Sequence, residues 1–242
     1  MSLVSAAALE GINAFQTLDV DQRNAIKSKL RATQYKAGEI IINHSENERD
    51  VFFIISGRVR TLMMSSNGKE VQFDDIEAGE MFGEIAALDG RSRTCDCVAL
   101  TDTSLAVMTQ NNFLFAVSTF DGLNLYIMTR LTQILRSYAG RVFEFSTHSV
   151  KDRVRYEVYR IAARQAKSRT GDITISDAPT HADIAARISS HREAVTRELK
   201  SLEKAGIITW KPGNHIVHNI GALMNPDSKS MEYPDETTIA TV

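Results

Sequence analysis

Two short helical patterns lie next to each other in this chain, over 183–188 and 190–202, and they constrain the fold more than any other feature. Each opens with a capping-box signature, at Thr180 for the first and at Ser190 for the second, and Gly206 marks the end of the second. Two short helices separated by only about three residues are typical of a helix-turn-helix. We therefore predict this motif here.

The second of these helices is predicted to be amphipathic. Val195, Leu199 and Leu202 recur at i, i+4 and i+7, so they form one apolar stripe. Its polar side chains include types that read base edges in the major groove of DNA. The candidate DNA-binding residues are Ser190, Arg192, Glu193, Thr196, Arg197 and Lys200. Two alternatives stay open: a solvated charged face on an ordinary helix, and a purely capping role for Glu193.

Charge and a predicted hairpin support nucleic-acid binding by the same segment. Of the 28 lysines and arginines and 30 aspartates and glutamates in the chain, 13 and 8 lie in 150–225, which leaves 15 and 22 elsewhere. The basic excess is therefore confined to the segment with the two helices, as phosphate contacts require. The β-prone runs 207–210 and 215–218 flank a Lys-Pro-Gly-Asn turn. This pattern predicts a β-hairpin, which would be the wing of a winged helix.

The first half of the chain predicts a β-structure. Short β-prone runs, separated by glycines, occupy 40–42, 51–55, 58–63, 70–73, 97–100 and 104–108. Short strands at this spacing are typical of an all-β barrel or roll. Asn67-Gly68 favours a type I′ turn between two of them. Residues 1–34 predict one or two short helices with four apolar anchors: Phe15, Leu18, Ile26 and Leu30.

The stretch from Gly83 to Thr94 has the features of a phosphate-binding site. Glycine at position 83 lets the backbone approach a ligand closely, and Glu84–Leu88 predicts a short helix whose first amides face a phosphate. Arg93 would pair with that phosphate, and Glu84 would accept a hydrogen bond from a sugar hydroxyl. We interpret the stretch as a cyclic-nucleotide phosphate-binding cassette. The alternative is a glycine-rich loop with a surface salt bridge between Glu84 and Arg93.

A long helix is predicted from Asp121 onwards, and it carries a seam of apolar residues. The seam steps by three and four residues, which is a heptad a/d pattern over about two and a half heptads. Its members are Met128, Leu131, Leu135, Tyr138, Val142 and Phe145. Such a seam needs a partner, and a second copy of the chain is the simplest one; burial within the helix's own domain is the alternative. We expect a hinge at 147–149 and another amphipathic helix over 150–167.

Composition argues against several classes of protein. The chain lacks an apolar run of about 18 residues and a basic region before the apolar residues near Met1, so we expect no membrane span, no signal peptide and a cytoplasmic location. No nucleophile–base pair or metal-ligand spacing stands out, so we expect neither an enzyme nor a metal site. Cys95 and Cys97 are too few for an iron–sulfur cluster, and their spacing disfavours a disulfide.

With the cassette, the long helix and the two-helix motif in this order, the chain resembles the CRP/FNR family of bacterial transcription regulators over roughly residues 10–220, and in particular its catabolite-activator-like branch. The resemblance implies that Glu84 binds the ribose 2′-hydroxyl of a cyclic nucleotide. It places the cyclic phosphate on Arg93, Thr94 and the amides near Ala86. The candidate effector-binding residues are Gly83, Glu84, Ile85, Ala86, Arg93, Thr94 and Tyr138.

The resemblance also covers the second helix of the motif, but one part of the effector site departs from it. For the second helix, the resemblance implies that Arg192, Glu193 and Arg197 read a TGTGA-type half-site. The hydroxyl pair that senses adenine in the branch falls on Tyr138-Ala139 here, so that pattern is missing. Thr94 resembles the position at which some relatives favour cyclic GMP. Cyclic AMP and cyclic GMP therefore both stay open as effectors.

We accordingly predict an α+β fold with an N-terminal β-roll that binds a cyclic nucleotide, a long dimerisation helix and a C-terminal winged helix-turn-helix. The expected parts are the roll over 1–118, the dimerisation helix and hinge over 119–148, the winged helix over 149–225 and a disordered tail over 226–242. The predicted function is a ligand-gated, homodimeric regulator, with an inverted repeat in double-stranded DNA and RNA polymerase as partners. The alternatives are a regulator of the same fold that senses haem, a redox signal or another ligand, and a regulatory subunit that acts on a protein instead of DNA.

Overall fold

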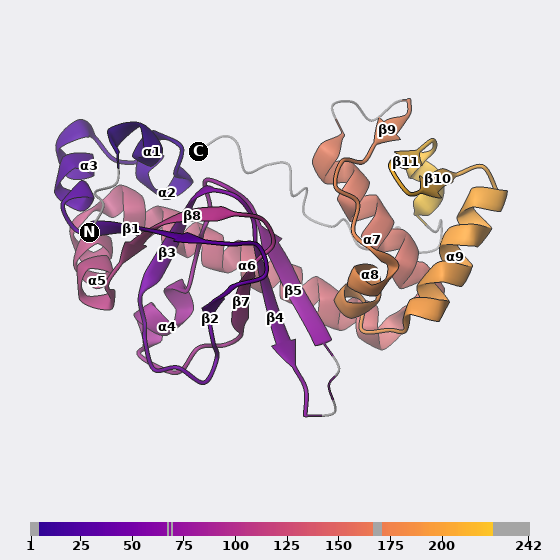
Figure 1. Ribbon diagram of the computed structural model, residues 1–242, viewed down its shortest axis with the longest axis horizontal. Helices are drawn as coiled ribbons and strands as arrows, with labels where there is room; N and C mark the ends of the chain where they lie inside the picture. Colours follow the sequence, from indigo (N-terminus) through magenta and orange to yellow (C-terminus); the bar gives the residue numbers. More distant parts are fainter. Residues whose placement is uncertain (1–4, 67, 69, 167–170, 225–242) are drawn as a thin grey trace. The chain divides into compact units, whose positions relative to one another are not determined.

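The computed structural model describes residues 5–66, 68, 70–166 and 171–224 (Figure 1). The predicted disordered tail over 226–242 lies outside the described residues, as does Asn67 of the predicted type I′ turn. The chain divides into two compact units, Met1–Gln133 and Ile134–Val242, which meet inside the long helix α6 (Asp121–Thr147). The domain limits predicted from the sequence stay a prediction.

The first unit is a β-roll made of two four-stranded sheets with antiparallel pairing (Figure 1). One sheet has the strand order β1-β8-β3-β6 and the other has the order β2-β7-β4-β5. The strands are β1 Leu30–Tyr35, β2 Ile40–Ile42, β3 Val51–Ser56, β4 Val59–Met64, β5 Glu70–Ile76, β6 Met81–Phe82, β7 Asp96–Ala99 and β8 Thr103–Met108. The helices of this unit, besides the first part of α6, are α1 Ala6–Glu10, α2 Asn13–Gln16, α3 Val20–Lys27, α4 Glu84–Asp89 and α5 Gln110–Thr119.

Strand β3 is apolar from Val51 to Ile55, and its first four residues are buried on both faces. Val51 and Phe53 belong to the core that the helices cover, and the Phe53 and Phe15 rings lie 4.7 Å apart between centroids. Phe52 and Ile54 point to the other face and belong to the core between the sheets. A strand that is covered on both sides reads as a continuous hydrophobic run rather than as an alternating one.

The sequence prediction of this unit was wrong at Leu30 and left α5 out. Leu30 does not anchor a helix but begins β1, where it pairs with Met108 of β8. Helix α5 was not predicted, and it buries Phe113 and Ala116. The hairpin of β4 and β5 is confirmed by its antiparallel register, which runs to the pair Met64 and Glu70.

The second unit is a winged helix with its own core. Its helices, besides the last part of α6, are α7 Val150–Gln165, α8 His181–Arg187, α9 Arg192–Lys204 and the 3₁₀ helix η1 Ile220–Leu223. Its sheet has the order β10-β11-β9, with β9 Ile173–Thr174, β10 Ile208–Lys211 and β11 Asn214–Val217. The wing hairpin is confirmed, because Lys211 pairs with Asn214 across a two-residue turn. The predicted inward face of α7 is also confirmed, since Val154, Val158 and Ile161 are buried.

The helix-turn-helix is confirmed, although one of its two predicted capping boxes is wrong. At Thr180 the box is complete: its side chain accepts from the Asp183 N–H, and the Asp183 carboxylate accepts from the Thr180 N–H. Helix α9 instead begins after His191, which makes no side-chain capping bond. Ser190 lies within the turn, so Glu193 does not serve as its capping partner. The α+β fold is thus as predicted.

The end of α9 follows from Gly206. This residue has φ +69°, which lies in the left-handed region that glycine adopts without strain. The Gly206 N–H donates to the Glu203 carbonyl and the Ile207 N–H donates to the Leu202 carbonyl. These two bonds are those of a Schellman motif, which satisfies carbonyls left open at the end of a helix.

None of the helices in the described part of the chain has both the length and the apolar character that a membrane span requires.

Candidate effector site and nucleic-acid interface

Gly83 is the point at which the cassette is folded. It precedes α4 with φ +84° and ψ +2°, in the left-handed region. A Cβ atom at this position would meet Arg93 Nη1 at 2.8 Å and the Asp50 carbonyl oxygen at 3.0 Å. Both the backbone conformation and the space therefore require glycine, and this close approach brings Arg93 against the turn.

The Arg93 guanidinium is a buried cation held by neutral groups. The residue is 8% exposed, and its Nη1 and Nη2 donate to the Gly83 and Asp50 carbonyls at 2.9 and 2.8 Å. Burial lowers the pKa of Arg93, because it penalises the charged form. In the described part of the chain, no carboxylate lies within 4.0 Å of the guanidinium. An anion would therefore supply the partner that this cation does not have.

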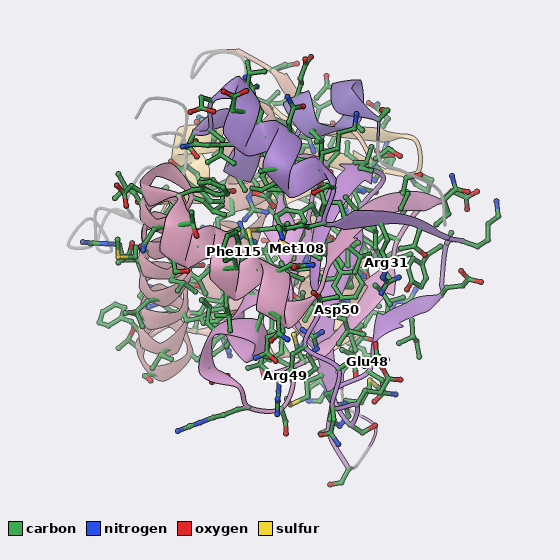
Figure 2. All side chains as sticks on the ribbon, turned by 90° about the vertical axis from the view of Figure 1, so that its left-hand side faces the viewer. Arg31, Glu48, Arg49, Asp50, Met108 and Phe115 are labelled. Carbon is green, nitrogen blue, oxygen red and sulfur yellow. The ribbon has the colours of Figure 1, made fainter. Side chains whose placement is uncertain are left out.

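The Asp50 carbonyl is itself fixed by an ion pair at the start of β3. Asp50 Oδ2 lies 3.0 Å from Arg31 Nη2 of β1, and Figure 2 shows these side chains with Glu48 and Arg49 nearby. The Asp50 side chain is thus engaged on β1 while its carbonyl faces Arg93. The charge of Asp50 partly opposes the lowering of the Arg93 pKa, but the Asp50 carboxylate makes its ion pair with Arg31.

Glu84 is buried next to a second arginine. It is 4% exposed, and burial raises the pKa of its carboxyl while Arg130 opposes that shift. Arg130 Nε lies 3.8 Å from Glu84 Oε1, and Arg130 Nη2 donates to the Met81 carbonyl at 2.6 Å. Arg130 Nε is buried without a hydrogen-bond partner among the residues described. The alternative arrangement, a surface salt bridge between Glu84 and Arg93, is therefore not the one seen.

Sequence reasoning missed Arg130, although a signal was present. Leu123 and Ile127 are buried on α6, and Arg130 follows them at helical spacing on the same face. An arginine in register with a buried stripe is expected to have a specific partner. Of the other predicted effector residues, Ala86 is buried, Ile85 is half-buried and Thr94 is exposed. Tyr138 lies on the part of α6 in the second unit, and its role stays a prediction.

Helix α9 presents a charged face opposite its apolar stripe. Val195, Leu199 and Leu202 are buried, as predicted. Four of the candidate DNA-binding side chains are exposed: Arg192, Glu193, Arg197 and Lys200. Because the capping box at Ser190 is absent, the Glu193 carboxylate is not needed at the helix start. Its exposed position is compatible with a base contact.

Thr196 makes hydrogen-bond contacts within the helix-turn-helix. Its hydroxyl donates to the Arg192 carbonyl, and it lies 2.9 Å from His181 Nδ1. The hydroxyl donor is thus used within α9, and the remaining lone pair faces the first residue of α8. His181 was not predicted, and burial together with Arg192 lowers its pKa. The pair joins the two helices of the motif.

Comparison with known proteins covers both parts of the chain. Residues 32–120 match the cyclic nucleotide-binding domain family, and residues 153–225 match the Crp-like helix-turn-helix domain family. These two domains in this order, together with relatives named as CRP proteins, decide the family. The chain belongs to the CRP/FNR family of transcription regulators.

Relatives of this CRP/FNR regulator match it over most of its length. The cyclic AMP receptor protein of Thermus thermophilus is 24% identical over 215 residues, which is 89% of this chain and 96% of that protein. A CooA variant from Carboxydothermus hydrogenoformans shares the fold with a TM-score of 0.75 at 18% identity, over 92% and 96% of the two chains. The c-di-GMP-responsive regulator CLP of Xanthomonas campestris gives a TM-score of 0.69 at 17% identity, over 83% and 99%.

The seam of this CRP/FNR regulator is largely uncovered within one chain. Five of its six residues, all except Leu131, are between 40% and 68% exposed. Leu131 is half-buried against the core of the first unit. A row of exposed apolar side chains along one helix is unusual for a surface that only faces water.

Proposed function

We propose that this DNA-binding transcription regulator is a homodimer whose affinity for an inverted repeat is controlled by a cyclic purine nucleotide, cyclic AMP or cyclic GMP. The observation that carries the proposal is the buried Arg93 cation, which is held by two carbonyls and has no carboxylate beside it. The cyclic phosphate would be that missing anion. The match of 32–120 to the cyclic nucleotide-binding domain family supports the same ligand class.

Glu84 and Arg130 would bind the sugar. The buried Glu84 carboxyl lies 3.8 Å from Arg130 Nε, whose charge opposes the rise in pKa that burial causes. Its ionised form would be a hydrogen-bond acceptor. A ribose 2′-hydroxyl is a donor of the required kind. In this proposal Arg93 and Thr94 bind the phosphate, and Gly83, Ile85 and Ala86 supply the turn that admits it.

Calorimetry with cyclic AMP, cyclic GMP and c-di-GMP tests the effector. Arg93→Ala is expected to cost roughly 2–5 kcal/mol of binding free energy, the range for truncating one side of a buried charged pair. Arg91→Ala is the matched control, since the exposed Arg91 is held only through its backbone in the described structure. Equal binding by wild type and Arg93→Ala, or no binding of either cyclic mononucleotide, would contradict the assignment. A Soret band in the purified protein would favour haem instead.

The exposed seam on α6 would join two copies of the chain in parallel. Leu135 lies at its middle and is 68% exposed. Leu135→Glu would place two like charges against each other in an apolar interface, so sedimentation is expected to show a monomer. Gln133→Glu, on the same helix but off the seam, is the control and should stay dimeric. A wild-type protein that sediments as a monomer at micromolar concentration would contradict the proposed dimer.

A twofold dimer would read two half-sites of an inverted repeat with α9. Arg192 and Arg197 are five residues apart on the helix, so they would reach different base pairs along the groove. Half-site centres are then expected about 10–10.5 base pairs apart. Selection from random duplexes should recover a TGTGA-like inverted repeat, and a direct repeat or no preference would contradict the reading. RNA polymerase as a partner and a cytoplasmic location stay predictions.

A further inference from the structure

A cluster of charges around two buried glutamates lies where α6, α7 and α8 meet within the second unit. Its members are Arg141 and Glu144 of α6, Glu157 and Arg160 of α7, and Arg187 of α8. We call this set the charged cluster. Arg160 is at its centre, with Nη1 donating to Glu144 Oε1 at 2.6 Å and Nη2 to Glu157 Oε2 at 2.8 Å. The second oxygen of Glu157 accepts from Arg187 Nη1 at 3.1 Å. The chain of contacts thus runs from α6 through α7 to α8.

The cluster is withdrawn from solvent, so its geometry is strictly required. Glu144 is 1% exposed and Glu157 is 3% exposed. Exposed ion pairs tolerate rearrangement, whereas a buried carboxylate that loses its partner is left uncompensated. The two acids can therefore be accommodated only while the three helices keep this arrangement.

A second connection links the same end of α6 to the turn of the helix-turn-helix. The Arg153 guanidinium carbon lies 5.4 Å from the centroid of the Phe145 ring of α6. Arg153 Nη1 also donates to the carbonyl of Ile188, the C-cap residue of α8, at 2.9 Å. The bend at 147–149 is thus spanned by two contacts, which join the end of α6 to two arginines of α7.

We propose that Glu144 and Arg160 are positioning residues for DNA recognition, which fix the last turns of α6 to α8 so that a displacement of the long helix reaches the helix-turn-helix without being absorbed at 147–149. The two compact units meet at Gln133 and Ile134, before the cluster, so the last turns of α6 belong with the winged helix. The transmission of an effector signal rests on the proposed function; the fixing of α6 to α8 does not.

Hydrogen exchange on the full chain tests the fixing directly. Glu144→Gln keeps the shape of the side chain and removes its charge from Arg160. We expect amide exchange over 141–150 to become about tenfold faster, while exchange of the buried strand β3 is unchanged. The matched control is Glu198→Gln, because Glu198 Oε1 pairs with Arg155 Nε at 2.6 Å and joins α7 to α9 without α6. That control is expected to affect α9 and to leave 141–150 unchanged.

The result that would overturn the proposal is unchanged exchange over 141–150 in Glu144→Gln, or the same acceleration there in Glu198→Gln. If Glu144→Gln does not fold, as judged by thermal melting, Glu144→Asp replaces it, since it keeps the charge and shortens the side chain by one methylene. Amide exchange over 141–150 and over β3 is then compared again. In Glu144→Asp we expect a smaller acceleration than in Glu144→Gln, and we expect it only over 141–150.

DNA affinity with and without cyclic AMP or cyclic GMP gives the second readout. In Glu144→Gln the ratio of the two affinities should fall by about fivefold or more, while calorimetry shows unchanged nucleotide affinity. Glu198→Gln should weaken DNA binding equally in both conditions. If the ratio of DNA affinities with and without nucleotide in Glu144→Gln equals the wild-type ratio, the proposal is overturned. A wild-type protein without any nucleotide effect would instead contradict the proposed function, and the exchange experiment would still decide the fixing of α6.

Discussion

The effector cassette and the charged cluster each contain a largely buried arginine, and the two differ in their partners. Arg93 donates to two neutral carbonyls, and burial lowers its pKa. Arg160 donates to Glu144 and Glu157, and although burial alone would lower its pKa, these two carboxylates raise it. A buried arginine whose charge is already balanced fixes structure. One whose guanidinium contacts only carbonyls can accept an anionic ligand.

The largest expected effect separates the two arginines by stability. Arg160→Met leaves two buried carboxylates without their shared partner, so the free energy of unfolding should fall by roughly 3–5 kcal/mol. Arg93→Met leaves no acid in an ion pair without its partner and should cost clearly less stability, although we expect it to lose nucleotide binding. Denaturation in urea without nucleotide gives both values. Equal losses of stability in the two variants would remove the distinction between the sites.

The pH dependence of stability sharpens the description of the charged cluster. Burial alone would raise the pKa of Glu157, but Arg160, Arg187 and Arg141 hold it at about 2, below its ordinary value of 4.5. The stabilisation is therefore complete above pH 4.5 and is lost as pH falls towards 2, and it amounts to about 3 kcal/mol. The difference in unfolding free energy between wild type and Glu157→Gln should shrink over this range. A difference that stays constant from pH 6 to pH 3 would contradict the shift.

A smaller effect tests the space around Arg93. Gly83→Ala and Gly90→Ala each place a side chain at positive φ at one end of α4, which should cost about 1–2 kcal/mol of stability. Only the Gly83 substitution also meets Arg93 and the Asp50 carbonyl, since nothing lies within 4 Å of a Cβ at Gly90. Calorimetry should therefore show weakened nucleotide binding in Gly83→Ala alone. Similar binding by both variants would mean that the close approach at Gly83 is not needed.

The smallest effects on stability are expected for the exposed cations on α9, which have neither of the two buried environments and act on DNA binding instead. Arg197→Ala should cost about 1–3 kcal/mol of DNA-binding free energy and relax the preference at one guanine, with little change in the salt dependence of binding. Lys200→Ala, assigned to a phosphate, should weaken all sequences alike and reduce the salt slope by about one. Titrations of specific and scrambled duplexes at several salt concentrations distinguish the two. If Arg197→Ala weakens binding to specific and scrambled duplexes equally, Arg197 contacts a phosphate and not a base.

Local signals were sufficient for most of the fold. The capping box at Thr180, the Schellman glycine Gly206 and the alternation of short apolar runs with glycines depend on neighbours in sequence, and the structure contains each of them. The failures have a local cause as well. A Ser-x-x-Glu spacing is present at Ser190, but the tight turn after α8 includes Ser190, so the helix begins one residue later.

The parts that could not be predicted depend on packing between distant segments. Glu144 and Glu157 have the spacing of ordinary surface charges on amphipathic helices, and only the meeting of three helices buries them. In the same way, Arg93 and Gly83 are suggested by the motif, whereas the carbonyl of Asp50 that completes the Arg93 environment is 43 residues away. Arg130 enters the site from α6 for the same reason.

Effector control of DNA binding is tested by the affinity of the whole chain for a duplex with the selected inverted repeat, with and without saturating cyclic AMP or cyclic GMP. We expect one of these nucleotides to tighten wild-type binding by about tenfold or more. Arg93→Ala should show no such response, and Arg91→Ala should respond as wild type does. A wild-type affinity that neither nucleotide changes, or an Arg93→Ala protein that responds fully, would contradict control of DNA binding through the Arg93 site.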